Sequence, residues 1–161
     1  MLGELFAALQ EWGPVSALRF SRWPYAGVNA AHIVGFAVLF GAILPLDLRL
    51  MGLWRSVPIG VLARILVPVA ATGLALAIAA GFLLFSVRAV DYAGTALFQV
   101  KMVLIVCALA NALLLHRAQQ WEAAQPNGGT LPPLRIRLAG AASIALWLSV
   151  IVCGRMIAFL F

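Results

Sequence analysis

The chain has 161 residues, of which 65% are hydrophobic and 10% are charged, and its mean hydropathy is +1.06. Soluble domains are about half apolar and about a quarter charged, so this composition excludes a soluble globular domain. It also excludes a disordered chain, because disorder requires low hydrophobicity and high net charge. The net charge is +6, but the basic residues lie mainly at the ends of apolar runs, as in membrane proteins. We therefore expect a lipid bilayer and no nucleic acid as the partner.

Residues 1–13 predict a short helix that precedes the first long apolar run. Leu2, Leu5, Phe6 and Leu9 recur at helical spacing, which is typical of an amphipathic helix on the membrane surface. A helix that simply packs on the rest of the protein fits the same spacing. Gly13 and Pro14 are expected to end it. The acidic residues and the early break in the apolar stretch do not match a secretory signal.

Four long apolar runs follow along the chain. Each is long enough to cross a hydrocarbon core of ~30 Å as a helix, and helices satisfy their own backbone hydrogen bonds in lipid. The predicted spans are residues 26–46, 65–85, 97–115 and 138–161. Their short connections predict an all-α, transmembrane up-down four-helix bundle in one integral membrane domain, residues 1–161.

Small residues at four-residue spacing predict where two of these helices approach closely. The first span contains Gly27, Ala31 and Gly35, and the second repeats the pattern at Gly73, Ala77 and Gly81. Such stripes allow backbones to approach each other within a membrane bundle. Pro45 and Pro68, near the ends of these spans, are expected to kink them.

Basic residues indicate the orientation of the bundle. The first and third loops contain six arginines, whereas the opposite side has three outside the spans. The positive-inside rule then places these two loops in the cytoplasm and both termini outside. We accordingly expect a multi-pass protein of a bacterial inner membrane, with both termini in the periplasm.

Several polar residues, which are energetically unfavourable in lipid, fall at one depth in the outer third of the predicted bundle. His32, Lys101 and Arg155 occupy the first, third and fourth spans at this depth, and Asn29 lies one turn from His32. Polar groups in lipid usually have a functional or pairing role. These four residues predict a site for an anionic or electron-rich ligand. The alternatives are that the cations extend to the outer headgroups or pair with Asp91, and that His32 bonds to a neighbouring helix.

Histidine geometry limits the cofactors that such a site can hold. The second histidine, His116, lies at the inner end of the third span, about 20 Å or more from His32 along the axis. The two cannot ligate one metal ion or one haem. A single haem b held by His32, alone or with Met102 or Met156, remains open, as does copper on the same residues. A quinone is a further candidate.

The inner side predicts a structural ion pair rather than a site. Asp47 lies just past Pro45, where it can pair with Arg64 or Arg117 across helices. Cys107 and Cys153 fall inside apolar runs without zinc spacing, so we interpret them as small buried residues.

Two stretches carry a family resemblance. Residues 31–52 (AHIVGFAVLFGAILPLDLRLMG) and residues 98–117 (FQVKMVLIVCALANALLLHR) resemble the histidine-bearing first span and lysine-bearing third span of small uncharacterised bacterial membrane proteins. That group is similar to membrane proteins of the copper-resistance-protein-D type. The matching positions are His32, Asp47, Arg49, Lys101, Asn111 and His116. The resemblance implies a four-helix membrane module linked to copper handling or electron transfer.

The sequence thus favours a small membrane binding or accessory protein with an outward-side site for a redox cofactor, haem or quinone, or for a metal. Two alternatives stay open. One is a structural subunit or assembly factor of a larger membrane complex, with other subunits or a second copy as partner and no cofactor. The other is a quinone-linked oxidoreductase with a single haem.

Overall fold

The computed structural model describes residues 2–117 and 131–160, and in this part of the chain the regular structure is entirely helical. Four helices are long and apolar enough to cross a membrane. They are α3 (Arg22–Met51), α4 (Ile59–Val87), α6 (Ala96–Arg117) and α8 (Leu134–Ile157). The predicted all-α four-helix bundle is confirmed, and the chain is a multi-pass membrane protein by the length and composition of these helices.

The first three long helices extend past both ends of the predicted apolar spans, whereas α8 begins earlier than the predicted span and ends at Ile157. The α3 helix continues through Pro45 to Met51 and ends at Gly52, whose φ of 109° is the left-handed conformation typical of a helix C-terminus. Arg49, in the last turn, is fully buried, and its guanidinium donates hydrogen bonds to the carbonyls of Val57 and Arg55 at 2.6 and 3.2 Å. A buried arginine that bonds to the following loop thus lengthens the helix beyond its apolar core.

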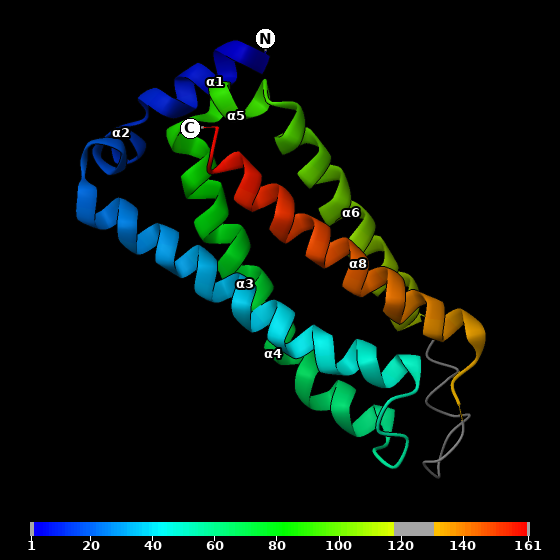
Figure 1. Ribbon diagram of the computed structural model, residues 1–161. Coiled ribbons are helices and arrows are strands. Elements are labelled where there is room, and N and C mark those ends of the chain that lie inside the picture. The colour runs from blue at the N-terminus through cyan, green and yellow to red at the C-terminus, as the bar shows by residue number, and fades with distance from the viewer. Residues whose placement is uncertain (1, 118–130, 161) are drawn as a thin grey trace.

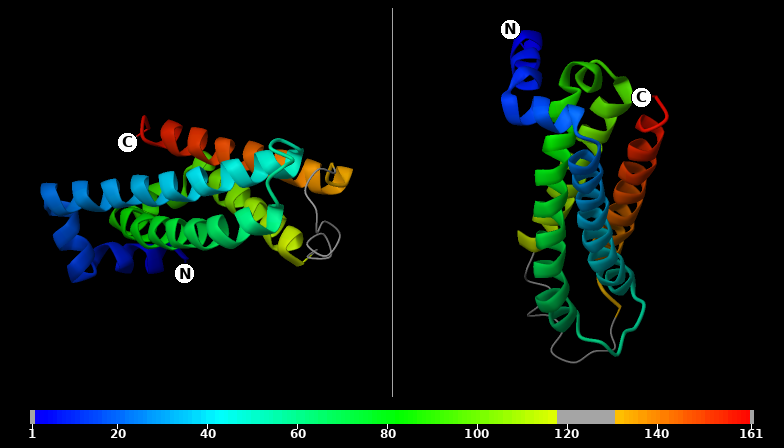
Figure 2. Two further views of the ribbon diagram at one scale, coloured as in Figure 1. Left: turned by 90° about the horizontal axis from the view of Figure 1, so that it is seen from below. Right: turned by 90° about the vertical axis from the view of Figure 1, so that its left-hand side faces the viewer.

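The four long helices form an up-down bundle (Figure 1) in which α3 is central. It packs against α4 and α8, and α8 packs against α6, whereas α4 and α6 are not closely packed on each other. Both chain ends lie at the end of the bundle that also contains α5, which we call the terminal end (Figures 1 and 2). The opposite end, where the loop 52–58 joins α3 to α4, is the loop end.

Short helices cover the terminal end. Two of them precede the bundle, α1 (Leu2–Glu11) and α2 (Gly13–Phe20), and α5 (Ala89–Ala93) lies between α4 and α6. Gly13 and Pro14 end the first helix as predicted, but Pro14 also stands in the first turn of α2, a position where its missing N–H costs nothing. Both α2 and α5 were absent from the sequence prediction.

Aromatic contacts fix the α1 helix on the bundle. Phe6 of α1 meets Phe85 of α4 edge-on at 5.6 Å, and Phe85 stacks on Phe98 of α6 at 5.2 Å. On the outer surface Trp12, Phe20 and Trp23 are exposed. Exposed aromatic side chains are typical of the boundary between lipid and water, so the terminal end matches a membrane interface.

The closest helix contact is the crossing of α3 and α4 at two glycines. A Cβ atom on Gly73 would lie 2.5 Å from the backbone nitrogen of Leu39 and 2.8 Å from the carbonyl oxygen of Gly35. A Cβ atom on Gly35 would lie 2.6 Å from the backbone nitrogen of Ala77. The predicted small-residue stripes therefore meet, and only glycine allows the two backbones to approach this closely.

All four long helices contribute to the core. Its buried members are Leu39, Ala42, Ala70, Ala108, Trp147 and Val150. Phe36 of α3 packs edge-on against Trp147 of α8 at 5.9 Å, which joins these two helices near their middles. Most other large apolar side chains point outward, as expected for helices solvated by lipid.

We expect Gly73→Ala to destabilise the protein by roughly 1–3 kcal/mol, because the added methyl group meets backbone atoms that cannot move aside cheaply. Gly41→Ala on α3 is the matched control, since a Cβ atom there meets nothing within 4 Å. Thermal unfolding of both variants in detergent checks this. Equal melting temperatures for the two variants would contradict the close crossing.

Candidate functional site

His32 is anchored to the neighbouring helix by one ring nitrogen. Its Nδ1 atom lies 2.8 Å from the carbonyl oxygen of Ala77 on α4. A carbonyl oxygen only accepts, so Nδ1 bears the proton and donates this bond. In the neutral ring Nε2 then has a free lone pair, and it has no hydrogen-bond partner among residues 2–117 and 131–160. The predicted bond from His32 to a neighbouring helix is present, and it leaves the second nitrogen available.

Gly81 makes the space that the His32 ring occupies. A Cβ atom on Gly81 would lie 2.9 Å from the ring carbon Cε1 and 3.1 Å from Nδ1. Gly81 is one helical turn beyond Ala77, so the same face of α4 provides both the acceptor and the room for the ring. His32 is thereby half-buried between α3 and α4.

Lys101, on α6, is a second half-buried basic side chain. It packs against Gly154 of α8, where an added Cβ atom would be 3.4 Å from Nζ. Lys101 is near enough to His32 and to Cys153 for its charge to influence both. In the described part of the chain no carboxylate lies within 4 Å of it. A second glycine thus makes room for a second basic side chain that the described carboxylates do not neutralise.

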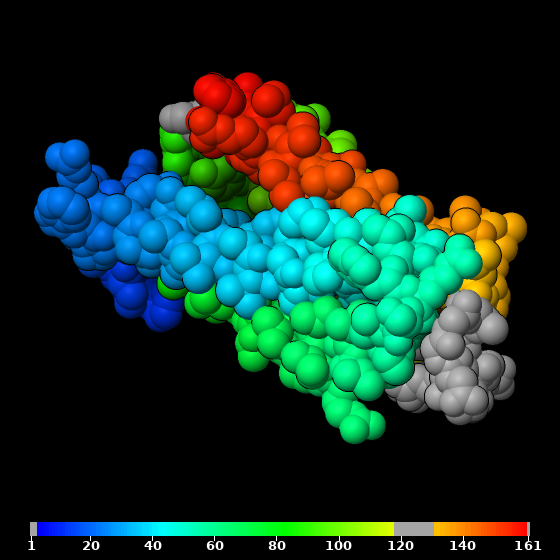
Figure 3. Space-filling view, turned by 60° about the horizontal axis from the view of Figure 1, so that its bottom comes forward, coloured from blue at the N-terminus to red at the C-terminus, as the bar shows by residue number. Residues whose placement is uncertain are grey.

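A hollow opens in the surface at the terminal end of the bundle. Figure 3 shows it between the terminal halves of α3 and α8, with green atoms from the α4-to-α6 part of the chain at its floor. The helices separate there because their closest contacts lie further toward the loop end, at Phe36 with Trp147 and at Gly140, where a Cβ atom would be 2.9 Å from the carbonyl oxygen of Asp47. The terminal halves of α3 and α8 therefore lie apart, on either side of this hollow.

The other two predicted site residues point elsewhere. Asn29 is exposed on the outside of α3. Arg155 is also exposed, and its guanidinium lies 4.7 Å from the centre of the Phe159 ring. Of the four predicted site residues, His32 and Lys101 are therefore half-buried, whereas Asn29 and Arg155 are exposed.

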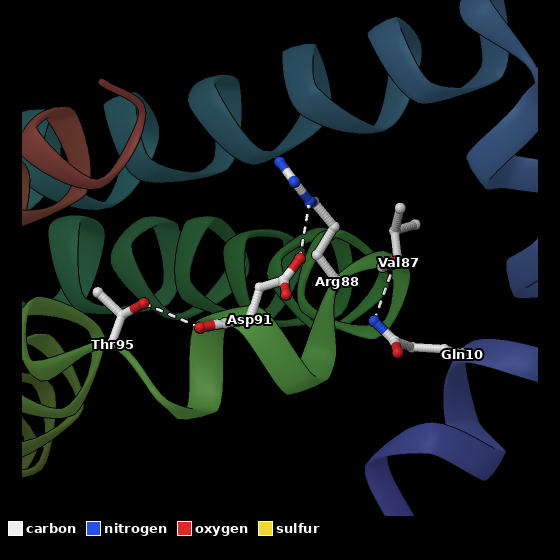
Figure 4. A network of polar contacts seen from close by, with 5 residues as sticks. All are labelled: Gln10, Val87, Arg88, Asp91 and Thr95. Carbon is white, nitrogen blue, oxygen red and sulfur yellow. Dashed lines mark hydrogen bonds and ion pairs between the residues drawn. The ribbon is translucent and has the colours of Figure 1, made fainter. Parts of the chain in front are cut away.

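Asp91 does not neutralise Lys101. Its carboxylate pairs with Arg88 at 3.1 Å, within α5 and its preceding turn (Figure 4). The same figure shows Thr95 donating to the Asp91 carbonyl at 2.8 Å and Gln10 of α1 donating to the Val87 carbonyl at 3.4 Å. This polar network secures the terminal end and lies outside the His32 and Lys101 site.

The predicted methionine ligands are not directed at His32. Met102 and Met156 are 44% and 46% exposed, on outward faces of α6 and α8. Among the described residues there is also no cluster of three or more His, Cys, Asp or Glu that could hold a metal ion. In this arrangement a haem or a copper ion would have one protein ligand from the predicted set, the His32 Nε2 atom.

The predicted ion pair of Asp47 is not formed. Asp47 is 4% exposed, Ser143 of α8 lies beside its carboxyl group, and its Oδ2 atom has no partner in the described part of the chain. Arg64 and Arg117 are both exposed. The residue missed by sequence reasoning is Ser143, which gave no signal because serine is common in apolar helices. At the same end Asn111 donates to the Ala139 carbonyl at 3.0 Å and joins α6 to α8.

A comparison with protein-family models identifies the chain's relatives. Residues 9–160 match the model described as "Family of unknown function (DUF6644)". The chain belongs to this family. The match includes all four long helices and both His32 and Lys101. Neither a curated protein nor a solved structure matches the chain.

We expect Ser143→Ala to lower the free energy of unfolding by about 1–3 kcal/mol, because it removes the hydroxyl group that lies beside the buried Asp47 carboxyl group. Arg64→Gln should change it by less than about 0.5 kcal/mol, since Arg64 is exposed and does not pair with Asp47. Thermal unfolding in detergent compares the two. If Arg64→Gln lowered the stability as much as Ser143→Ala, the result would support the predicted ion pair of Asp47 with Arg64 instead.

Proposed function

We propose that this member of the family is a small integral membrane binding protein whose terminal-end site holds a redox cofactor between His32 and Lys101, with a quinone as the best-fitting class. The observation that supports this most strongly is a histidine with a free ring nitrogen near a lysine that no described carboxylate neutralises. A charged group in lipid is expensive unless a partner neutralises it, and no described side chain does so here.

The two nitrogens match the two forms of a quinone head. The Lys101 ammonium donates hydrogen bonds to a carbonyl oxygen or to a deprotonated hydroxyl. His32 Nε2, as an acceptor, takes a hydrogen bond or a proton from a quinol hydroxyl. The hollow between α3 and α8 opens sideways, so an apolar ligand dissolved in the bilayer reaches the site without crossing water.

Haem b is the second candidate, supported by the anchoring of His32. Histidines that ligate metals commonly donate their other N–H group to a backbone carbonyl, as His32 does to Ala77. In this case His32 Nε2 would be the axial ligand and Lys101 would neutralise a propionate. The single-haem, quinone-linked oxidoreductase belongs to this candidate. Copper has weaker support because Met102 and Met156 point outward.

A cofactor-free structural subunit is the third candidate. The α6 helix supports it, because Ala108 is its one fully buried residue and its outward apolar side chains, such as Val103, Val106 and Leu113, are exposed and could face another subunit or a second copy. We further propose that the protein lies in a bacterial inner membrane with both termini in the periplasm. The excess of arginine at the loop end supports this orientation.

Quinone binding is tested on the detergent-purified protein by titration with a short-chain benzoquinone in a calorimeter. We expect Lys101→Met to weaken binding by about tenfold or more, since hydrogen bonds to charged groups contribute about 1.5–3 kcal/mol. Arg155→Gln is the matched control, because it removes a cation at the same end that does not face the site. Equal losses in the two variants, or no binding by the unaltered protein, would overturn the quinone proposal.

The absorption spectrum separates the candidates. A Soret band that disappears in His32→Ala would show that the cofactor is haem and not a quinone. A colourless protein that binds no quinone and purifies with another subunit would favour the structural role.

A further inference from the structure

A second region able to bind a ligand lies at the loop end, remote from His32 and Lys101. It is a groove of about 330 Å³ between α4 and α6, two helices that are not closely packed on each other. It is lined by Gly60, Ala63, Arg64, Val67, Pro68 and His116. The sequence predicts an ion pair for Arg64 and no site for His116, so neither prediction accounts for the groove.

Among the described residues, the polar side chains that line the groove are those of Arg64 and His116, and both can donate hydrogen bonds. Arg64 offers a planar guanidinium, whose fork of N–H groups matches a phosphate. His116 adds an imidazole from the facing helix. Within residues 2–117 and 131–160, neither has a carboxylate within 4 Å. The charge of the lining therefore selects an anion.

The surrounding surface strengthens this selection. Arginines at the loop end are numerous, and Asp47 is the one acidic residue at this end in the described part of the chain. That acid is buried, so it does not compensate them. The exposed loop-end arginines are Arg55, Arg64, Arg117, Arg135 and Arg137.

The flanks of the groove are apolar and face outward. On α4 the exposed side chains of Val61 and Ile65 adjoin it, and on α6 those of Leu113 and Leu114 lie close in sequence to His116. Within the groove Pro68 lacks an N–H group and cannot donate the helical hydrogen bond to the carbonyl of Arg64. The ligand that fits is therefore amphiphilic, with an anionic headgroup and acyl chains. A hydroxyl group on the headgroup could donate a hydrogen bond to the Arg64 carbonyl.

We propose that this groove binds the phosphate headgroup of an anionic phospholipid, such as phosphatidylglycerol, between Arg64 and His116, with its acyl chains along the exposed faces of α4 and α6. Basic pockets between transmembrane helices commonly hold anionic lipid heads. The lipid would fill the space between two helices that protein side chains leave loosely packed.

The test is native mass spectrometry of the delipidated protein in detergent, titrated with phosphatidylglycerol or with phosphatidylcholine. We expect one phosphatidylglycerol to bind at least fivefold more tightly than phosphatidylcholine. Arg64→Gln and His116→Gln should each weaken this binding severalfold. Arg135→Gln is the control, because it removes one exposed arginine from the same end outside the groove.

Each outcome decides the proposal. Equal weakening by Arg64→Gln and Arg135→Gln would show attraction to the charged end as a whole and overturn a specific site. Competition by millimolar inorganic phosphate would assign the groove to a free anion instead of a lipid. Thermal unfolding of the variants without added lipid verifies that they are folded, and the double variant Arg64→Lys with His116→Lys, which keeps cationic groups, should restore most of the binding.

Discussion

The structure depends on one face of α4, on which Gly73, Ala77 and Gly81 follow one another at intervals of four residues. Gly73 allows the backbones of α3 and α4 to touch, with Gly35 and Leu39 directly opposite. The Ala77 carbonyl accepts the hydrogen bond of His32, and Gly81 leaves room for its ring. Helix packing and the position of His32 therefore have the same physical origin, which is the absence of side-chain atoms along this stripe.

Polar groups lie in both halves of the bundle. Toward the loop end, Arg49 donates hydrogen bonds to loop carbonyls, Asn111 joins α6 to α8, and Ser143 lies beside Asp47. Among the described residues, two buried atoms at this end, Arg49 Nη1 and Asp47 Oδ2, have no partner. In the terminal half, beyond the contact of Phe36 with Trp147, α3 and α8 separate, and the described residues do not neutralise Lys101 or bond to Nε2 of His32. This separation of the helices is the physical basis for the proposed ligand site in the terminal half.

Much of the fold followed from the sequence, because composition and helix length suffice to identify spans in lipid. The hydrogen bond from His32 to a neighbouring helix was also among the interpretations that the sequence allowed. The direction in which each side chain points around its helix axis could not be predicted from the sequence in this way. Each residue turns a helix by about 100°, so Arg155 directed outward and Gly154 directed inward are neighbours in sequence with opposite surroundings. The same uncertainty explains the outward positions of Asn29, Met102 and Met156.

The predicted end of the first span was too early for a different reason. Charged residues suggested an end to the first span near Leu46, but Arg49 is buried, and the last turn is closed by Gly52 in a left-handed conformation. Glycine just past a helix is a recognised stop signal, so this end was available in the sequence. The position of Ser143 beside Asp47 could not be predicted, because Ser143 is distant in sequence and has no distinguishing pattern.

The most direct test of this account is the protonation pattern of the His32 ring in bilayers, measured by nitrogen NMR on histidine-labelled His116→Gln protein. The account predicts a proton on Nδ1, bonded to the Ala77 carbonyl, and an unprotonated Nε2 whose signal moves when a benzoquinone is added and fails to move in Lys101→Met. A proton on Nε2 with a free Nδ1 would contradict the anchoring of His32 and with it the proposed site.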